Sequence, residues 1–274
     1  DVSALAGKPV RLRFMMKDAD LYSLKFHQPT EAQLKAEAEA KAEEARAAAE
    51  AKARAAAEAK AAAEAKAQAA AEAKAAAEAK AQAAIEAAVR KAAKKPTGEL
   101  TKADFEEVGN LRLDNYQLTD VKRLEKLTQL RSLNLGLNNL TDVKGLEKFT
   151  LLKTLSLARN KLTDVKGLEK LTQLEVLGLG SNQLTNVKGL EKLTQLRTLS
   201  LAGNKLTDVK GLENLTQLKS LNLGANQMTD VQGLEKLTQL EMLNLQSNPD
   251  LTKAQIAELQ KALPECEIHR ETTK

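Results

Sequence analysis

The sequence is poor in aromatic residues and in cysteine, and these shortages exclude several classes of site. It has no tryptophan, and aromatic residues make up 2% of the chain, so it lacks the stacking platforms that bind single-stranded nucleic acid. Cys266 is the single cysteine, which excludes an internal disulfide and a metal site built from cysteines. The sequence contains no run of eighteen apolar residues and therefore predicts no membrane-spanning helix.

The charges of the chain are nearly balanced and are dispersed along it. The 42 Lys and Arg residues exceed the 37 Asp and Glu residues by a formal net charge of +5. Because the two signs alternate throughout, this pattern is typical of a solvated surface and not of a basic patch that binds nucleic acid. We therefore expect no nucleic-acid partner.

Residues that could form a catalytic centre do not cluster in the sequence. His27 and His269 lie at opposite ends of the chain, and no serine lies in a nucleophile-elbow motif. Cys266 lies in a predicted closing strand, where a buried thiol is usually inert. We predict no enzyme activity, no catalytic residue and no cofactor in the part of the chain present.

A repeat of 22 residues occupies residues 108–248, in seven units that align without a gap, which indicates a solenoid. Three apolar columns recur in every unit: Val108, Leu130, Leu152, Leu174, Leu196, Leu218 and Leu240; Leu111, Leu133, Leu155, Leu177, Leu199, Leu221 and Leu243; and Leu113, Leu135, Leu157, Leu179, Leu201, Leu223 and Leu245. An asparagine column follows, with Asn138, Asn160, Asn182, Asn204, Asn226 and Asn248. In the first unit Tyr116 occupies the same position.

The physical chemistry of one unit explains these columns. In Leu133-Asn134-Leu135 a polar residue separates two apolar ones, which predicts a short strand with both leucines facing inward. Asn138 lies where the chain must turn. Because its amide both donates and accepts hydrogen bonds, stacked asparagines can satisfy backbone groups of adjacent coils. The apolar residues that follow recur every three residues and predict a 3-10 or short helical return: Leu140, Val143, Leu146 and Phe149.

The repeat unit has a recognisable consensus. From Leu162 to Gln183 it is L-T-D-V-K-G-L-E-K-L-T-Q-L-x-x-L-x-L-x-x-N-x, which resembles the 22-residue class of bacterial leucine-rich repeats that includes the internalins. The resemblance implies an α/β fold, in which a leucine-rich-repeat horseshoe has a parallel β-sheet on one side and 3-10 or helical segments on its convex side. It also implies a binding role, although this fold carries binding roles of many kinds.

Capping segments are predicted at both ends of the solenoid. Residues 100–103 and 251–254 share the sequence Leu-Thr-Lys-Ala, and each threonine is a good helix N-cap. Thr252 forms a capping box with Gln255. A helical face that covers the open end of the core is predicted from Ile256, Leu259 and Leu263. Pro264 ends this helix, and a short strand follows it.

Residues 31–95 consist mainly of Ala, Glu, Lys and Gln, which are strong helix formers. Pro29 marks the start of the predicted helix and Pro96 marks its end. A continuous helix of this length would span roughly 95 Å at 1.5 Å per residue. Apart from alanine, it has no apolar stripe between Leu34 and Ile85. The segment resembles the alanine-rich helical region of Tol-type proteins that reach across a bacterial periplasm. Two interpretations stay open, a solitary spacer and a weakly self-associating coiled coil.

Residues 1–28 predict a β-hairpin. Residues 10–14 alternate as a strand, residues 17–20 form a turn, and residues 21–26 form a second strand. Two strands alone are marginally stable in water, so we interpret the segment as the remnant of an upstream β-sandwich domain. Residues 1–10 are similar to the closing strands of jelly-roll domains in bacterial carbohydrate-active proteins.

One carboxylate column runs through the repeats and has two interpretations. It comprises Asp120, Asp142, Asp164, Asp208 and Asp230, with Asn186 in their midst. Neighbouring coils would hold these carboxylates roughly 5 Å apart, as in a metal ladder. Alternatively, each side chain caps the return turn that follows it. Asn186 caps equally well but would weaken a cation site, so we predict capping and no metal. A glycine column predicts a tight or left-handed turn: Gly145, Gly167, Gly189, Gly211 and Gly233.

A binding surface is expected where the strand residues point outward. These columns are mostly small and polar, with few of the Trp, Tyr and Arg residues that dominate interfaces. The candidate ligand-binding residues are Arg112, Asp114, Tyr116, Asn134, Leu137, Ser156, Arg159, Asn222, Met242 and Asn244.

The sequence thus predicts a hairpin remnant (1–28), a helical spacer (29–98) and a capped leucine-rich-repeat domain (99–274). The predicted function is a non-catalytic scaffold that binds a protein or an envelope polysaccharide through the solenoid. Two alternatives stay open. The chain is either the C-terminal portion of a larger carbohydrate-active or carbohydrate-binding protein, or a structural spacer with a stabilising terminal domain. We expect a bacterial cell-envelope or secreted protein whose targeting signal lies upstream of Asp1.

Overall fold

The computed structural model describes residues 29–270. The hairpin expected within residues 1–28 lies outside the described residues and stays a prediction. The chain divides into two units after Gln68. The second unit contains the C-terminal part of helix α1 (Glu31–Ala92) and the whole β-sheet. Within the described residues, no helix is both long enough and apolar enough to cross a membrane.

Helix α1 is a single helix of 62 residues, as the alanine-rich composition predicts. Thr30 begins it: its hydroxyl accepts from the Gln33 amide, and its own amide donates to the Gln33 side chain, which satisfies two free N–H groups. The residues from Glu31 to Lys80 are exposed, so packing contributes little to this stretch. Ion pairs four residues apart link its surface side chains, as in Arg54–Glu58 at 3.0 Å, and each stabilises a helix by about 0.3–0.5 kcal/mol.

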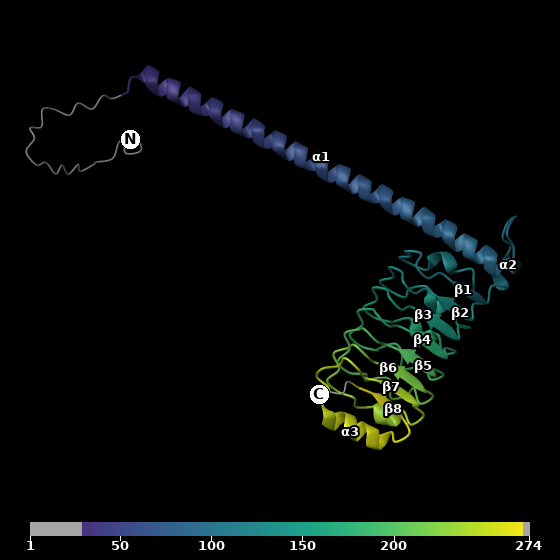
Figure 1. Ribbon diagram of the computed structural model, residues 1–274. Coiled ribbons are helices and arrows are strands. Elements are labelled where there is room, and N and C mark those ends of the chain that lie inside the picture. The colour runs from purple at the N-terminus through teal and green to yellow at the C-terminus, as the bar shows by residue number, and fades with distance from the viewer. Residues whose placement is uncertain (1–28, 271–274) are drawn as a thin grey trace, which may run out of the picture. The chain divides into compact units, whose positions relative to one another are not determined.

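The repeats form an unclosed solenoid with one parallel sheet of eight strands in sequence order. The seven repeat strands are β1 (Asn110–Arg112), β2 (Ser132–Asn134), β3 (Thr154–Ser156), β4 (Val176–Gly178), β5 (Thr198–Ser200), β6 (Ser220–Asn222) and β7 (Met242–Asn244). Each residue of strands β1 to β6 pairs in register with the residue 22 positions later, as in Leu111 with Leu133. Figure 1 shows the strands stacked in order along one side of the solenoid, with the return segments on the other side. The leucine-rich-repeat fold predicted from the sequence is confirmed.

The return segments contain the predicted 3-10 turns. Four of them are assigned as 3-10 helices: η2 (Lys122–Leu124), η3 (Leu146–Lys148), η4 (Leu168–Lys170) and η5 (Leu234–Lys236). Glycines of the glycine column precede η3, η4 and η5. The whole column has the left-handed conformation, with φ values of 94° to 107°, as predicted. At Gly189 a Cβ atom would lie 2.9 Å from the Val165 carbonyl oxygen, so this turn needs glycine for both its conformation and its close approach.

The core is one continuous stack of leucine side chains. All three leucine columns are buried in every coil, and Phe149 is the largest fully buried side chain. No single coil could enclose these residues alone, because each strand residue packs between the equivalent residues of its neighbours. Burying one leucine stabilises the fold by about 1.5–3 kcal/mol.

The C-terminal cap forms as the sequence predicts. Thr252 and Gln255 make the capping box at the start of α3 (Lys253–Ala262), and Ile256, Leu259 and Leu263 are buried. Strand β8 (Glu267–His269) then adds to the sheet beside β7. Cys266 is buried directly before it. Burial raises the pKa of the Cys266 thiol, which keeps it protonated and unreactive at neutral pH.

The N-terminal cap differs from the predicted domain boundary. A short helix, α2 (Lys102–Glu106), carries the predicted Thr101 cap, but it is not the whole cap. The last turns of α1 also enter the leucine core through the buried side chains of Ala81, Ile85 and Val89, and Ala93, directly after the helix, is buried with them. The predicted division between a spacer at 29–98 and a repeat domain at 99–274 therefore does not match the packing. The end of α1 belongs to the solenoid.

Candidate binding surface

The outward-pointing strand residues form a surface that we call the sheet face. Two columns make it up: Asn110, Ser132, Thr154, Val176, Thr198, Ser220, Met242 and Glu267; and Arg112, Asn134, Ser156, Gly178, Ser200, Asn222, Asn244 and His269. Over the middle strands these side chains are short and mostly polar. The larger side chains lie at the two ends of the sheet, and Val176 is the exception.

Three asparagines among the predicted ligand-binding residues have a structural role. The Oδ1 atom of each accepts a hydrogen bond from the backbone N–H two residues later, at 2.9 Å for Asn134, 3.0 Å for Asn222 and 2.9 Å for Asn244. Such a bond fixes the end of a strand as the chain leaves the sheet. Their side-chain oxygens are therefore already engaged, and these asparagines are weaker candidates for ligand recognition than the sequence alone indicates.

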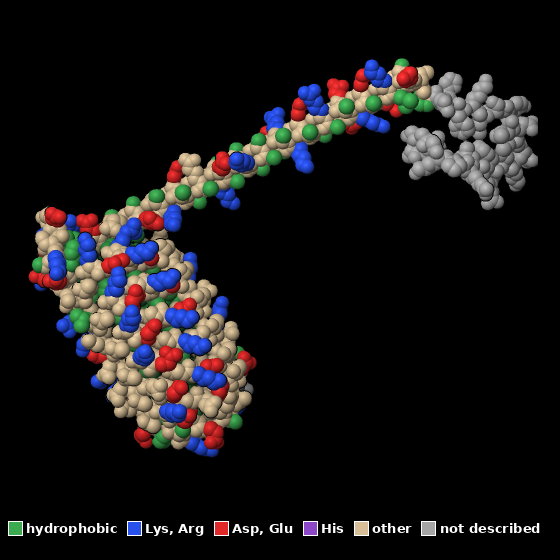
Figure 2. Space-filling model, turned by 180° about the vertical axis from the view of Figure 1, so that it is seen from behind, with side chains coloured by type: hydrophobic (Ala, Val, Ile, Leu, Met, Phe, Trp, Pro, Cys, Tyr) green, Lys and Arg blue, Asp and Glu red, His purple; other side chains and the backbone are tan. Residues whose placement is uncertain are grey.

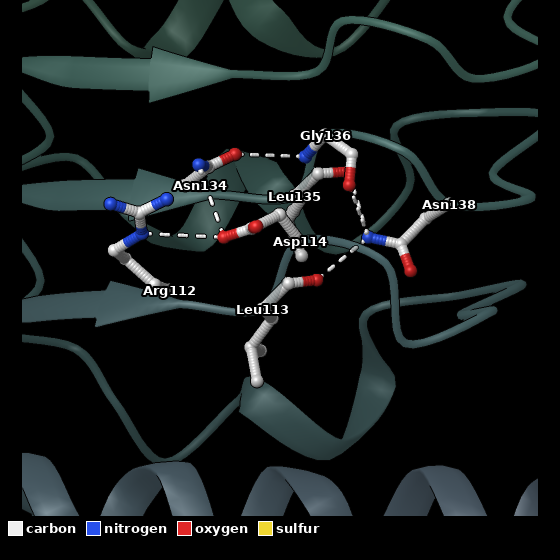
Figure 3. A network of polar contacts seen from close by, with 7 residues as sticks. All are labelled: Arg112, Leu113, Asp114, Asn134, Leu135, Gly136 and Asn138. Atoms are coloured by element: carbon white, nitrogen blue, oxygen red, sulfur yellow. Dashed lines mark hydrogen bonds and ion pairs between the residues drawn. The ribbon is translucent and has the colours of Figure 1, made fainter.

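The predicted residues of the first coil form a connected cluster with the second coil (Figure 3). The Nε atom of Arg112 lies 3.3 Å from Oδ1 of Asp114, and Nδ2 of Asn134 donates to the same oxygen at 3.3 Å. Asp114 thus holds one arginine and one amide across two neighbouring strands. The arginine side chain is 79% exposed, so the cluster presents an oriented guanidinium to solvent.

Tyr116 is anchored by the asparagine column. The Oδ1 atom of Asn138 accepts from the backbone N–H of Tyr116 at 3.1 Å and from that of Leu118 at 2.9 Å. Its Nδ2 atom donates to the carbonyl oxygens of Leu113 and Leu135, drawn with the Arg112 cluster in Figure 3. The backbone that carries Tyr116 is thereby fixed, while its side chain stays exposed.

A second column beside the sheet face is held in the left-handed conformation. It comprises Asn115, Leu137, Arg159, Ser181, Gly203, Ala225 and Ser247, with φ values of 53° to 68°. This conformation costs a residue with a Cβ atom roughly 1–2 kcal/mol. Leu137 bears this cost although its side chain is 47% exposed, so burial does not offset it. Arg159 likewise carries a long exposed side chain there.

A groove separates the end of α1 from β1, with a volume of about 760 Å³. One wall is the helix and the other is the first coil, with lining residues Ala87, Ala88, Lys91, Ala92, Asn110, Leu111, Arg112, Asp114 and Tyr116. Reasoning from the sequence missed this groove because α1 was interpreted as a spacer. The available signal was Ile85 and Val89, the only large apolar residues in the last part of an alanine helix, spaced to share one face.

The structure does not bring all ten predicted residues together. Arg112, Asp114, Tyr116, Asn134 and Leu137 belong to the first two coils. The next coil contains Ser156 and Arg159. The remaining three, Asn222, Met242 and Asn244, lie on β6 and β7 near the other end of the sheet. Met242 is exposed there without an aromatic or arginine side chain on the same strand.

The carboxylate column caps the return turns, as predicted. Each Asp, and likewise Asn186, accepts from the backbone N–H two residues later at 2.9–3.2 Å. A glutamate column adds a second set of bonds to the left-handed glycines, as in Glu169 with Gly167. Hydrogen bonds from the glutamate's own backbone N–H and from that of the glycine two residues earlier lower the pKa values of Glu169 and Glu213. Within residues 29–270, no group of three His, Cys, Asp or Glu side chains is arranged to hold a metal ion.

Lys and Arg are interspersed with Asp and Glu over the side of the solenoid seen in Figure 2. Salt bridges between neighbouring coils contribute to this pattern, for example Lys148–Glu125 at 2.6 Å. That face therefore carries no field of a single sign.

Comparison with known proteins agrees with this geometry. The family described as "Leucine Rich repeats (2 copies)" matches residues 150–192, 194–234 and 216–260, and "Leucine Rich repeat" matches residues 126–149. No curated protein matches the sequence.

Two solved structures illustrate the likeness. Internalin C2 from Listeria monocytogenes is 28% identical with a TM-score of 0.55, and the match covers 69% of this chain and 92% of that one. A leucine-rich-repeat protein from Leptospira interrogans is 30% identical with a TM-score of 0.51, and the match covers 62% of this chain and 51% of that one, about half its length. By repeat sequence, coil geometry and structural likeness, the repeats of this chain form a leucine-rich-repeat solenoid like that of the internalins.

Proposed function

We propose that this chain is a non-catalytic scaffold that binds a protein partner through the N-terminal end of the sheet face. We define the N-terminal patch as Arg112, Asp114, Tyr116 and Leu137 together with the groove against α1. The observation that carries the proposal is the concentration of these side chains in two adjacent coils, beside a groove of about 760 Å³.

The composition of the N-terminal patch is that of an interface centre. Interface energy is concentrated in a few residues, and Tyr and Arg are among the most frequent. Tyr116 is the one exposed aromatic residue among residues 29–270, with 37% of its surface accessible, and it lies four residues from Arg112. The middle strands offer only short side chains, such as Ser156 and Gly178, which supply little contact area.

The N-terminal patch is also rigid. Asp114 orients Arg112, and Asn138 fixes the backbone of Tyr116. Side chains that are already ordered lose less conformational entropy when a partner binds, so more of the contact energy appears as affinity. Leu137 supports the same proposal, because an exposed leucine in a left-handed conformation lowers stability with no benefit to the folded chain alone.

The exposed part of α1 serves, in this proposal, as a helical spacer that displays the solenoid. Its ion pairs and alanines hold a helix together without a packing partner. The stretch from Glu31 to Lys80 would span roughly 75 Å at 1.5 Å per residue.

Site-specific photo-crosslinking in the producing cell tests the proposal. A photoreactive phenylalanine analogue replaces Tyr116 in one variant and Lys188, on a return turn, in a matched control. We expect a protein adduct of defined mass from position 116 and none from position 188. Equal adducts from both positions, or an adduct with polysaccharide alone, would contradict the proposal.

A further inference from the structure

The charges around the N-terminal patch are unevenly paired. Arg112 has Asp114 as its partner, but Lys91, Arg131 and Arg159 form no ion pair with any residue between 29 and 270. The patch and its rim thus combine four cationic side chains with a single carboxylate.

One of these unpaired cations lines the groove, and the other two lie on the second and third coils. Lys91 lines it from the helix side. The backbone N–H of Arg131 donates to the carbonyl oxygen of Gly109, directly before β1, at 2.7 Å, which places Arg131 at the rim of the first strand. Arg159 follows Leu137 in the left-handed column one coil further on.

Further along the sheet, several cations have carboxylate partners. In the column that begins with Arg131, Lys153 lies 2.8 Å from Glu175 and Lys219 lies 2.6 Å from Glu241. At the last strand, His269 Nε2 lies 3.3 Å from Glu267. Arg197, between these two pairs, lies near Glu175. Around the first three coils, by contrast, Lys91, Arg131 and Arg159 have no ion-pair partner among residues 29–270.

The groove combines polar residues with an apolar part. The small side chains of Ala87, Ala88 and Ala92 form the helix wall, and the Tyr116 side chain borders the strand wall. Alanines leave room for a side chain from outside, and an apolar group placed there would lose contact with water on both sides.

We infer that the N-terminal patch binds an acidic peptide segment of its protein partner, with one apolar side chain of that segment seated in the groove between α1 and β1. This inference rests on the proposed function and names the chemistry of the partner. The acidic side chains pair with Lys91, Arg131 and Arg159, while the apolar side chain packs against Tyr116 and the alanines. Charge pairs at the rim act mainly on the association rate and fall with ionic strength.

Selection from a phage-displayed library of random twelve-residue peptides, with the full chain as target, tests the inference. We expect the selected peptides to be rich in Asp and Glu and to share one large apolar residue. Their dissociation constants, measured by fluorescence anisotropy, should rise with added salt. Arg131→Glu and Lys91→Glu should each weaken binding by about 3- to 30-fold, since each reversal replaces an attraction of up to about 1 kcal/mol by a repulsion of similar size. Lys188→Glu, on a return turn, should leave the affinity unchanged.

The possible failures separate the two proposals. Selection of neutral or basic peptides whose binding is lost in Tyr116→Ala would overturn the acidic partner and leave the binding surface intact. Peptides whose affinity is unaffected by Tyr116→Ala and by Leu137→Gly would overturn both. A library that yields no binder would overturn the peptide-segment inference, while the crosslinking experiment would still decide whether the patch binds a folded partner.

Discussion

The Nδ2 atom of Asn138, in the second coil, lies 2.8 Å from the carbonyl oxygen of Leu113 in the first coil. The same buried amide also donates to the carbonyl oxygen of Leu135 and accepts from the backbone N–H groups of Tyr116 and Leu118. Asn138→Ala should lower the free energy of unfolding by about 2–4 kcal/mol, because each buried group left without a partner costs about 1–3 kcal/mol. Urea denaturation followed by circular dichroism measures the change.

Asn139→Ala is the matched control for this prediction. It makes the same substitution one residue later. The Asn139 side chain is half-buried and makes no hydrogen bond to any residue between 29 and 270. Its effect should stay within about 0.5 kcal/mol. Similar losses for both variants would mean that the asparagine column does not join the coils.

The solenoid could be predicted from the sequence because its determinants are local and repeated. Asn138 and Gly145 each perform the same task as their equivalents in other coils, so the column itself reveals the role. The left-handed conformation at Leu137 could not be predicted in this way, since the residues of its column share no side-chain chemistry. It became evident only from the backbone.

The groove and the true N-terminal cap could not be predicted with the same certainty. Alanine, glutamate and lysine specify that α1 is helical, but they do not specify what the helix packs against. Only Ile85 and Val89 distinguish the packed end from the exposed stretch. Two apolar residues in a long helix are a weak pattern. The groove depends on the distance between α1 and β1, and the sequence of the helix does not specify that distance.

The packed and exposed parts of α1 should respond differently to the loss of an aliphatic side chain. Ile85 is 5% exposed and belongs to the leucine core. Ile85 also lines two solvent-open grooves at the surface of the helix. Ile85→Ala should therefore destabilise the solenoid by about 2–3 kcal/mol, at the lower end of the range for such truncations, because neighbouring side chains there have room to adjust. Thermal and urea unfolding of the repeat domain measure the effect.

Leu34→Ala provides the comparison within the same helix. Leu34 is 53% exposed, so its truncation should change stability by less than about 0.5 kcal/mol. If Ile85→Ala were equally neutral, the end of α1 would not be part of the cap.

Lowering the pH should destabilise the N-terminal cap, because it protonates Asp104. The hydrogen bond from Lys95, at 2.7 Å, and those from Thr101 lower the pKa of Asp104 to about 2, below the value of about 3.9 for a free aspartate. A depressed pKa in the folded state contributes stability above about pH 4 that is lost as the pH falls toward 2. Asp104→Asn should therefore lower Tm at pH 7, and the difference from wild type should disappear near pH 2.

Asp250→Asn controls for general acid effects. Asp250 is exposed, and no described residue supplies it with a hydrogen bond or an ion pair. Its Tm difference from wild type should be small at every pH. A Tm difference for Asp104→Asn that did not depend on pH would assign the loss to packing or geometry and not to the charge of the carboxylate.

Leu137 should show opposite effects on stability and on binding. At φ 56°, Leu137→Gly should raise the free energy of unfolding by up to about 1 kcal/mol, since relief of left-handed strain exceeds the added flexibility of glycine in the unfolded chain. The same variant removes an apolar contact from the N-terminal patch, so a photoreactive probe at position 116 should give less adduct. Ser181→Gly, at the equivalent position two coils away, should gain stability with no loss of adduct. A Leu137→Gly variant that was less stable than wild type would show that the leucine supports the fold, and the case for its role in binding would fall.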